Sequence, residues 1–336
     1  MRAFVIKRLL LGLVVLFGVI FITFVMTRVI PSDPARQWVG PRASQEKLAA
    51  ARIELCLDDP LFVQFGKFVV SLAQGNLGKS LRSHQPVLKE LKTFLPATLE
   101  LVLLSTLFGI FLGLYLGVIS AKRKDQWIDH ICRFFSVGTV SIPTFWIGLL
   151  LQFVFYGALD WLPLGERLSM KVKLLYEVPD ITGMLLFDSL VTGNFVVFWD
   201  AFKHIILPGF VMALFPIGLV ARMTRSALLE ILSEDYIKAG RSYGLSERII
   251  MWSYALKNSL GPTATVVTLA IGYTLVNTFL VEAIFSWPGI GNYIANAVVT
   301  LDYPAIMGVT IFSACSYVLL NLAADLIIAL DPRVRT

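Results

Sequence analysis

The chain has 336 residues, of which 57% are hydrophobic and 15% are charged, and its formal net charge is +6. A soluble domain carries roughly 25% charged residues, so this composition excludes an ordinary soluble protein and indicates an all-α integral membrane protein in a lipid bilayer. The positive charge does not imply a nucleic-acid partner. Lys and Arg in loops that face anionic lipid account for it, and no basic run interleaved with aromatic residues occurs.

Six apolar stretches are long enough to cross hydrocarbon about 30 Å thick as helices. They are residues 9–26, 101–120, 134–156, 205–221, 264–284 and 305–330. The first could be mistaken for a signal peptide, because Arg2, Lys7 and Arg8 precede it. No small-x-small cleavage site follows, so we expect a retained transmembrane helix within residues 1–30.

The distribution of Lys and Arg predicts the orientation of these six helices. With an inside N-terminus, the cytoplasmic pieces are residues 1–8, 121–133, 222–258 and 331–336. The outer pieces are then residues 31–93, 157–204 and 285–304. Lys and Arg are more than twice as dense in the first set as in the second. Because this excess marks cytoplasmic loops, we expect a multi-pass protein of the cytoplasmic (inner) membrane with both termini in the cytoplasm.

The first outer piece, residues 31–93, is too long for a simple turn and is not of low complexity. Leu61, Phe65 and Phe68 recur at helical spacing after Pro60, which predicts an amphipathic helix there. We therefore expect a small folded region on the outer face, followed by a membrane core at residues 94–336. A second external insert extends from Leu159 to His204.

Prolines lie inside two of the predicted spans. Pro143 lies in the third span, and Pro208 and Pro216 lie in the fourth. A proline within a membrane helix frees a carbonyl group that needs another partner. We expect both spans to be interrupted at these positions; a kinked helix lines a pathway or results from packing alone.

Several segments that suggest a cofactor site fail on inspection. The segment QGNLGKS at residues 74–80 is similar to a phosphate-binding loop, but the glycine required five residues before Gly78 is replaced by Ala73. The histidines fall in separate loops without catalytic partners, and the cysteines give neither a disulfide framework nor a metal-ligand spacing. We therefore expect no catalytic, cofactor-binding or metal-binding residue in this chain.

Ionisable groups inside membrane helices are costly and often functional. Glu282 lies near the outer end of the fifth span. Asp325 lies in the sixth span, one helical turn from Asn321, so that these two side chains could form a hydrogen bond. One hypothesis is that the three residues form a polar pathway or gate. The alternative is a hydrogen bond between helices or with a partner subunit.

The most informative stretch is SEDYIKAGRSYGLSER at residues 233–248, which is polar and lies between two apolar spans. Tyr236, Gly240 and Tyr243 recur at helical spacing with Ala239 beside them, which predicts a short helix. Gly244 suits the left-handed position just past a helix end, with the hydrophobic Leu245 after it.

Ser246 suits the N-cap of a following helix, with Glu247 in its first turn. These signals predict a rigid helix-turn-helix element in the cytoplasm, which we call the elbow (residues 234–248). By physical chemistry alone the elbow is either a well-capped loop or a docking element for another protein.

The sequence EDYIKAGRSYGLSERIIMWSYALKNSLGP resembles the cytoplasmic loop of ABC importer permeases in its peptide-permease variant. Gly240 and Gly261 stand where that family usually has alanine and leucine. Other stretches resemble the same family in order along nearly the whole chain, among them IPSDPAR, FLPATLEL, SIPTFWIG, RMTRSALLEIL, EAIFSWPGIG and DPRVR. The long first external loop and LLYEVPDITG resemble the first permease subunit of dipeptide or oligopeptide importers.

The resemblance implies the type I ABC importer permease fold, with six transmembrane helices and an external folded loop after the first. It also implies a second homologous permease subunit, one or two ATPase subunits that hold ATP and Mg, and an extracytoplasmic substrate-binding protein. The elbow would be the coupling helix that docks on an ATPase. Its docking residues would be Tyr236, Lys238, Ala239, Gly240, Arg241, Tyr243, Gly244, Leu245 and Ser246.

The function expected from this resemblance is ATP-driven import of peptides. Relatives of this subunit also serve nickel chelates and oligosaccharides, so these substrates are alternatives on the same scaffold. An ion-coupled secondary transporter is the main rival class, but such proteins typically show internal repeats and intramembrane charge pairs, and the sequence shows neither. A membrane enzyme has no visible catalytic residues.

Overall fold

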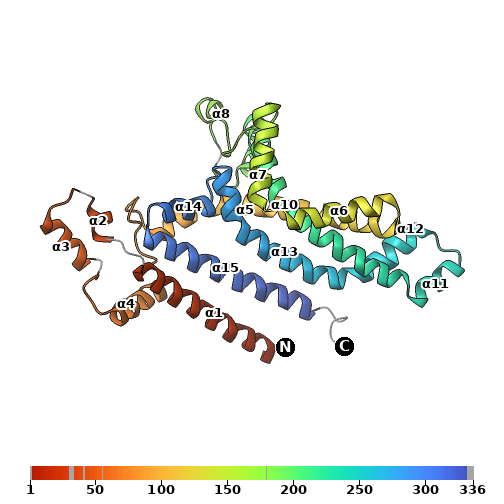
Figure 1. The fold of residues 1–336 in the computed structure, drawn as a ribbon, viewed down its shortest axis with the longest axis horizontal. Helices are drawn as coiled ribbons and strands as arrows, with labels where there is room; N and C mark the ends of the chain where they lie inside the picture. The colour runs from red at the N-terminus through yellow and green to blue at the C-terminus, as the bar shows by residue number, and fades with distance from the viewer. Residues whose placement is uncertain (1, 30–33, 41, 55, 179, 331–336) are drawn as a thin grey trace. The chain divides into compact units, whose positions relative to one another are not determined.

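The computed structural model describes residues 2–29, 34–40, 42–54, 56–178 and 180–330, apart from the side chains of residues 2–5, 27–29, 34, 37, 54, 260, 262, 265, 276 and 323–330. The described chain is helical, and an isolated bridge joins Lys79 and Pro86. In chain order the elements are α1 (Arg2–Val29), α2 (Pro34–Val39), α3 (Gln45–Glu54), α4 (Leu61–Ala73), α5 (Val87–Lys122), α6 (Trp127–Ser141), α7 (Thr144–Gln152), the π-helix η1 (Phe153–Ala158), α8 (Met170–Leu175), α9 (Leu185–Val191), α10 (Phe195–Leu232), α11 (Asp235–Ser242), α12 (Glu247–Ile249), the π-helix η2 (Ile250–Ala255), α13 (Leu256–Ile284), α14 (Ile290–Val299) and α15 (Tyr303–Leu330) (Figure 1).

The chain forms two compact units. Unit 1 contains residues 1–96 and 292–322, and unit 2 contains residues 97–291 and 323–336. In unit 1, α1 lies against α15, because a Cβ atom at Gly12 would be 2.7 Å from Cγ1 of Val318. The predicted helix after Pro60 is confirmed as α4, whose Phe65 ring packs edge-on against Phe21 of α1 with ring centroids 5.7 Å apart.

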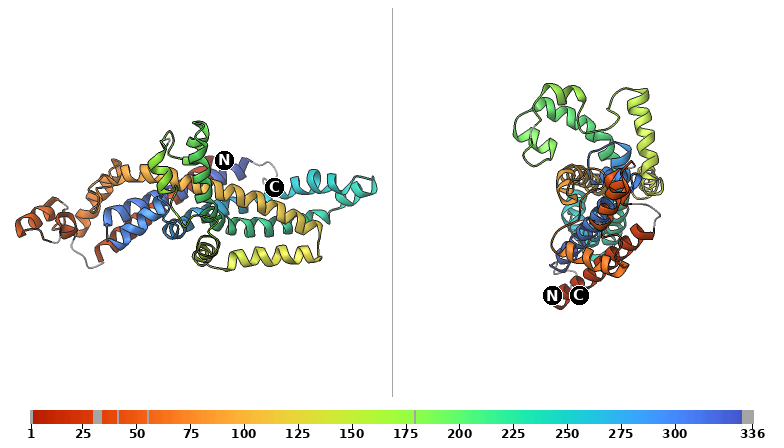
Figure 2. Two further views of the ribbon diagram at one scale, coloured as in Figure 1. Left: turned by 90° about the horizontal axis from the view of Figure 1, so that it is seen from above. Right: turned by 90° about the vertical axis from the view of Figure 1, so that its left-hand side faces the viewer.

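Unit 2 is built around α10, which packs along α13 and against α6, α7 and α9 (Figure 2). Three glycines of α5 at i, i+4 and i+8 let α5 approach α10 closely. A Cβ atom at Gly113 would be 2.9 Å from Cβ of Val220, and Gly109 and Gly117 face Pro216 and Thr224 in the same way. Close approach through small residues is a common way for membrane helices to associate.

Among the described residues, four helices are long and apolar enough to span a membrane, and the number rises to six if each of two bent pairs counts as one span. The four are Ile6–Met26, Val87–Lys122, Phe195–Leu232 and Tyr303–Leu322. The most apolar window of the third is 78% buried inside the protein, whereas that of the first is 6% buried. The third is therefore a core helix, while the first presents most of its surface to the surroundings.

The prolines have different effects from those expected. The predicted third span is broken at Pro143, where α6 and the α7–η1 segment meet at an angle of 103°. Pro208 and Pro216, in contrast, lie inside the continuous α10, so the predicted interruption of span four is wrong. Both are buried, and Pro216 fills the space left by Gly109, so packing holds the helix together despite the lost backbone hydrogen bonds.

The insert between η1 and α10 is organised around Asp188, which is fully buried. Its carboxylate accepts hydrogen bonds from the backbone N–H groups of Ile181, Thr182 and Gly183 and from the Thr182 hydroxyl. Burial opposes ionisation of Asp188, but the hydrogen bonds from Thr182 and its neighbours outweigh it and hold the pKa below the ordinary value. The carboxylate therefore fixes the path of this loop.

Candidate functional site

The elbow has the structure that its sequence predicts. Its first helix, α11, ends at a Schellman motif: the N–H of Gly244 bonds to the carbonyl of Arg241 at 3.0 Å, and the N–H of Leu245 bonds to that of Gly240 at 3.1 Å. Gly244 has φ of +81°, a conformation that glycine adopts without strain. The Ser246 hydroxyl then caps α12 by accepting a hydrogen bond from the N–H of Ile249 at 3.4 Å.

Ion pairs reinforce the elbow on its exposed side. The guanidinium group of Arg241 donates from Nε and Nη2 to the two carboxylate oxygens of Glu247, at 2.8 and 3.3 Å, and so joins α11 to α12. Lys238 pairs with Asp235 within α11 at 2.7 Å. The hydrogen bonds from Arg241 hold the pKa of Glu247 below its ordinary value of 4.5, and the same contact raises the pKa of Arg241.

Two contacts fix the elbow to the helices that flank it. Ile237, an apolar residue in an otherwise polar helix, is 1% exposed. The hydroxyl of Tyr236 accepts a hydrogen bond from the side-chain amide of Asn258 in α13 at 3.0 Å. The inward role of Ile237 was not predicted, although an isolated isoleucine on a polar helix was the available signal.

Below the elbow, the ends of α5, α10, η2 and α13 share one apolar cluster. Its buried members are Val118, Ala121, Leu228, Met251 and Ala255. Because α11 itself contacts η2 and α10, a displacement of the elbow acts on helices that are packed together at this point. The elbow is thus attached to unit 2 as one rigid piece.

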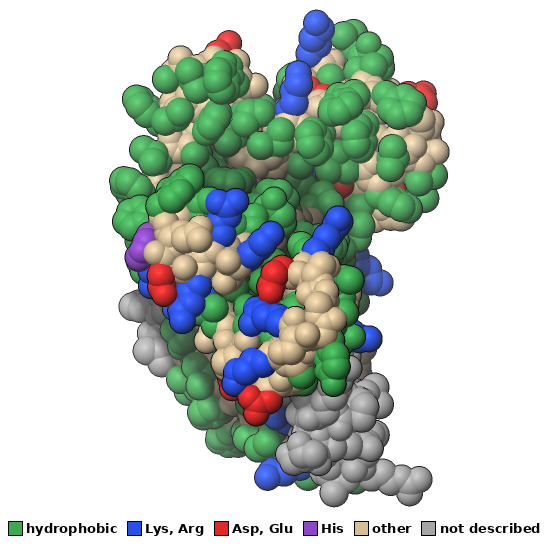
Figure 3. Space-filling view, turned by 90° about the vertical axis from the view of Figure 1, so that its right-hand side faces the viewer, with side chains coloured by type: hydrophobic (Ala, Val, Ile, Leu, Met, Phe, Trp, Pro, Cys, Tyr) green, Lys and Arg blue, Asp and Glu red, His purple; other side chains and the backbone are tan. Residues whose placement is uncertain are grey.

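The outward face of the elbow is polar with an aromatic tip. Tyr243 is 87% exposed, and Lys238 and Ala239 are exposed beside it. Gly240 is half-buried, since a side chain there would meet Leu245 at 3.3 Å. Figure 3 shows Lys and Arg side chains gathered on the end of the molecule that carries α11 and α12. This face offers an exposed aromatic ring, two small residues and positive charge.

The opposite end of α13 leads into the Glu282 turn (residues 282–291), most of which is buried, with Ser286 and Pro288 exposed. The Glu282 carboxylate accepts hydrogen bonds from the Thr98 hydroxyl and from the N–H of Gly291, both at 2.7 Å. The Trp287 indole donates to the carbonyl of Ala97 at 2.9 Å. Glu282 is 0% exposed, and its contact with Thr98 joins α13 to α5; a role of Glu282 in a pathway or gate stays a prediction.

The other two residues of the predicted pathway lie in α15. Asn321 is half-buried. The side chain of Asp325 lies outside the described residues, so the predicted hydrogen bond between them stays a prediction. Among the described residues no group of three or more His, Cys, Asp or Glu side chains could hold a metal ion.

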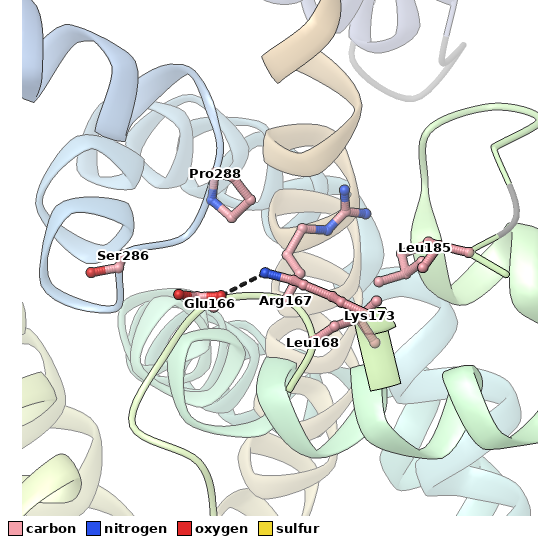
Figure 4. Close-up of a pocket in the computed structure, with 8 residues that line it drawn as sticks. Glu166, Arg167, Leu168, Lys173, Leu185, Ser286 and Pro288 are labelled. Carbon is pink, nitrogen blue, oxygen red and sulfur yellow. Dashed lines mark hydrogen bonds and ion pairs between the residues drawn. The ribbon is translucent and has the colours of Figure 1, made fainter. Parts of the chain in front are cut away.

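A pocket of about 580 Å³ lies beside the Glu282 turn, between the external insert and residues 286–288 (Figure 4). Figure 4 shows Lys173 and Glu166 joined across it by an ion pair of 2.6 Å. Arg167 also lines the pocket, but its guanidinium group is engaged by Glu100 at 2.5 Å and lies over the Trp287 ring at 5.6 Å. These contacts leave its charge largely neutralised.

Sequence reasoning missed a buried ion pair near the elbow. Asp129 of α6 is 0% exposed and receives two hydrogen bonds of 2.7 Å from Nε and Nη2 of Arg225 in α10. The Ser120 hydroxyl and the N–H of Asp125 donate to the same carboxylate. The available signal was an acidic residue at the edge of an apolar helix, which is costly without a partner.

Comparison with known proteins shows that the chain is similar to membrane components of transport systems along its length. Residues 109–336 match the family described as binding-protein-dependent transport system inner membrane component, and residues 1–102 match the N-terminal region of such membrane components. The chain is 44% identical over 325 residues to the probable D,D-dipeptide transport system permease protein DdpB of Escherichia coli K12, covering 96% of this chain and 95% of that one. It is 38% identical over 336 residues to the dipeptide transport system permease protein DppB of Alkalihalophilus pseudofirmus, covering 100% of both chains. It is 33% identical over 338 residues to the oligopeptide transport system permease protein AppB of Bacillus subtilis, covering 99% of both.

Proposed function

Since the chain belongs to the family of binding-protein-dependent transport system inner membrane components, we propose that it is the transmembrane pathway subunit of an ATP-driven peptide importer. Its relatives are permeases for dipeptides and oligopeptides, which supports the dipeptide and oligopeptide class of substrate. The chain contributes the membrane pathway, and separate subunits bind ATP and Mg²⁺ and hydrolyse the ATP.

The proposed assembly contains four kinds of protein. This chain crosses the inner membrane six times, with each bent helix pair counted as one span and both termini in the cytoplasm. A second homologous permease encloses the pathway together with it, and one or two ATPase subunits bind on the cytoplasmic side. An extracytoplasmic binding protein delivers the substrate to the outer loops. The excess of Lys and Arg around residues 121–133 and 222–258 supports this orientation.

In this proposal the elbow is the coupling helix. The exposed Tyr243 and the small residues Ala239 and Gly240 seat in a groove of the ATPase, whose closure on ATP displaces the elbow. Because the elbow is capped at its turn and attached to α10 and α13, the displacement passes to both helices as a rigid-body movement. Since α10 and α13 pack along each other, they move together and change the access of the pathway.

The observation that carries this proposal is the combination of a rigid backbone and an exposed face in the elbow. A substitution at Gly244 tests the turn alone. Its left-handed φ of +81° disfavours β-branched residues, and a Cβ atom there would meet nothing within 4 Å, so a new side chain strains the backbone without a steric clash. We expect Gly244→Val to distort the Schellman turn and uncouple ATP hydrolysis from transport in the reconstituted complex, while the chain still inserts into the membrane.

Gly193→Val is the matched control. Gly193 has φ of +71°, also has open space around it, and ends α9 with the same two backbone hydrogen bonds. The Gly193→Val variant should keep the ratio of peptide transported to ATP hydrolysed near that of the wild type. Undiminished transport by Gly244→Val would contradict the coupling role, and peptide transport by the purified chain alone in a proton gradient would favour the secondary-transporter alternative.

A further inference from the structure

A second pocket, of about 250 Å³, lies where α5, α6 and α10 meet, near the buried Asp129–Arg225 pair. Three arginines line it: Arg133 from α6, and Arg222 and Arg225 from α10. Its other lining residues are Leu116, Ser120, Cys132, Ser136, Val137, Ala221 and Ser226. No acidic residue lines the pocket among the described residues, so every charged side chain of its lining is an arginine.

The nearby carboxylates neutralise only part of this charge, chiefly that of Arg225. Asp129 is enclosed beneath the pocket and is engaged by Arg225 through both of its oxygens. Arg133 is 3.7 Å from Asp129, is 44% exposed, and shares a 2.7 Å contact with the ring of His130. Arg222 is exposed and has no ion-pair or hydrogen-bond partner among the described residues. Asp125, the other carboxylate that affects Arg225, lies exposed in the turn before α6.

The helix on one side of the pocket has the pattern of a membrane-facing helix. The buried face of α6 is polar and consists of Asp129, Cys132, Ser136 and Thr139. Its exposed face is apolar and consists of Ile131, Phe134, Phe135, Val137 and Val140. A helix that faces water would have its apolar residues buried and its polar residues exposed. The outer face of α6 is therefore suited to lipid acyl chains. The arginines thus lie beside a lipid-facing apolar surface.

We propose that this pocket binds a phosphate group, and that its source is the headgroup of an anionic phospholipid. Guanidinium groups donate to phosphate oxygens in a matching planar geometry, and the exposed Ser226 hydroxyl adds a further donor. Leu116 and Val137 line the same pocket, and the apolar face of α6 extends from them. In the proposal these residues contact the part of the acyl chain that is nearest to the headgroup. Basic pockets between membrane helices bind anionic headgroups by this chemistry. The bound lipid joins α5, α6 and α10 next to the apolar cluster below the elbow.

The test uses the full-length chain purified in mild detergent and exposed to mixed micelles that contain phosphatidylglycerol or phosphatidylcholine. Native mass spectrometry measures how much lipid each chain retains. The pocket variant is Arg133→Gln/Arg222→Gln, and the control is Arg123→Gln/Lys124→Gln, which removes the same charge from the adjacent exposed turn. Ser226→Glu is a second pocket variant that keeps every arginine and adds a repelling charge.

We expect the wild type and the control to retain phosphatidylglycerol in preference to phosphatidylcholine. Each arginine lost from the pocket should weaken phosphatidylglycerol binding about fivefold, and Ser226→Glu should also weaken it. Equal retention by all variants would overturn the proposal, as would loss of the lipid when the partner subunits are added. Displacement of the lipid by millimolar inorganic phosphate would assign the site to the free ion and overturn the lipid source.

Discussion

The chain changes direction sharply on both sides of α13, and different interactions stabilise the two turns. Before the beginning of α13, and joined to it through η2, the elbow is held mainly by hydrogen bonds between residues that are close in sequence, such as Gly244 to Arg241 and Leu245 to Gly240. At its end, the Glu282 turn is held by side chains that reach α5, with Thr98 184 positions away from Glu282. The elbow is therefore a locally encoded structure, and the Glu282 turn is a product of tertiary packing.

The two ends also differ in exposure. Tyr243 of the elbow is 87% exposed, whereas Phe285 and Trp287 of the turn are each 1% exposed. Under the proposed coupling role, a substitution on the exposed face of the elbow should weaken docking without unfolding the chain. A substitution in the Glu282 turn leaves buried polar groups unpaired and should act mainly on stability.

The largest effect is expected from Glu282→Ala. It removes the acceptor of the Thr98 hydroxyl and of the Gly291 N–H, both buried, and opens a cavity. We expect a loss of about 3 kcal/mol or more in the free energy of unfolding, which is seen as a lower midpoint of thermal unfolding in detergent. Glu177→Ala, at an exposed position in the external insert, is the matched control and should change the midpoint little. Equal midpoints for the two variants would contradict the long-range role of Glu282.

A somewhat smaller effect is expected from Gly289→Ala. A Cβ atom at Gly289 would lie 2.3 Å from both carboxylate oxygens of Glu282, so the turn must shift to accept it. Overpacking of this kind costs about 1–3 kcal/mol. Gly138→Ala is the control, because a Cβ atom there meets nothing within 4 Å and alanine favours the helix α6. A stabilising Gly289→Ala would show that the turn is looser than these contacts indicate.

Ser246→Ala tests the local encoding of the elbow. The hydroxyl group is the N-cap of α12, and its loss should destabilise the elbow by about 1 kcal/mol. Faster amide hydrogen exchange should be confined to residues 243–250, with no change in the Glu282 turn. Ser242→Ala serves as the control, because that hydroxyl bonds only to the carbonyl of Lys238 within α11. Exchange that spreads to residues 282–291 would show that the two ends of α13 are coupled in stability.

The smallest effect concerns the Arg241–Glu247 pair, which is exposed and contributes a few tenths of a kcal/mol. Its hydrogen bonds hold the pKa of Glu247 below the ordinary 4.5 in the folded protein. The contribution is therefore complete above about pH 4.5 and is lost as the pH falls through the lowered pKa of the folded state. Amide protection in the elbow should decrease over that acidic range, and Glu247→Gln should abolish the pH dependence. An unchanged profile in the variant would assign the effect to another group.

Part of this molecule is determined by short sequence patterns. The elbow's helix, its glycine turn and its Ser246 cap were predictable, because capping acts between residues three to five positions apart. The helix α4 after Pro60 was predictable from the spacing of its apolar residues. Apolar runs likewise indicate membrane helices, since hydrocarbon thickness sets their length.

Only the tertiary structure decided how the remaining groups are used. Asp129 and Arg225 are 96 positions apart, and no pattern in the sequence near either residue predicts its partner. Pro143 lies at the break of a span, whereas Pro216 lies inside a continuous helix and packs against Gly109 of α5. Glu282 stood out in the sequence as an unusual charge, and the fold gave it Thr98 and Gly291 as partners. A local pattern specifies the backbone within a few residues, whereas the partner of a buried polar group is known only when distant helices have packed together.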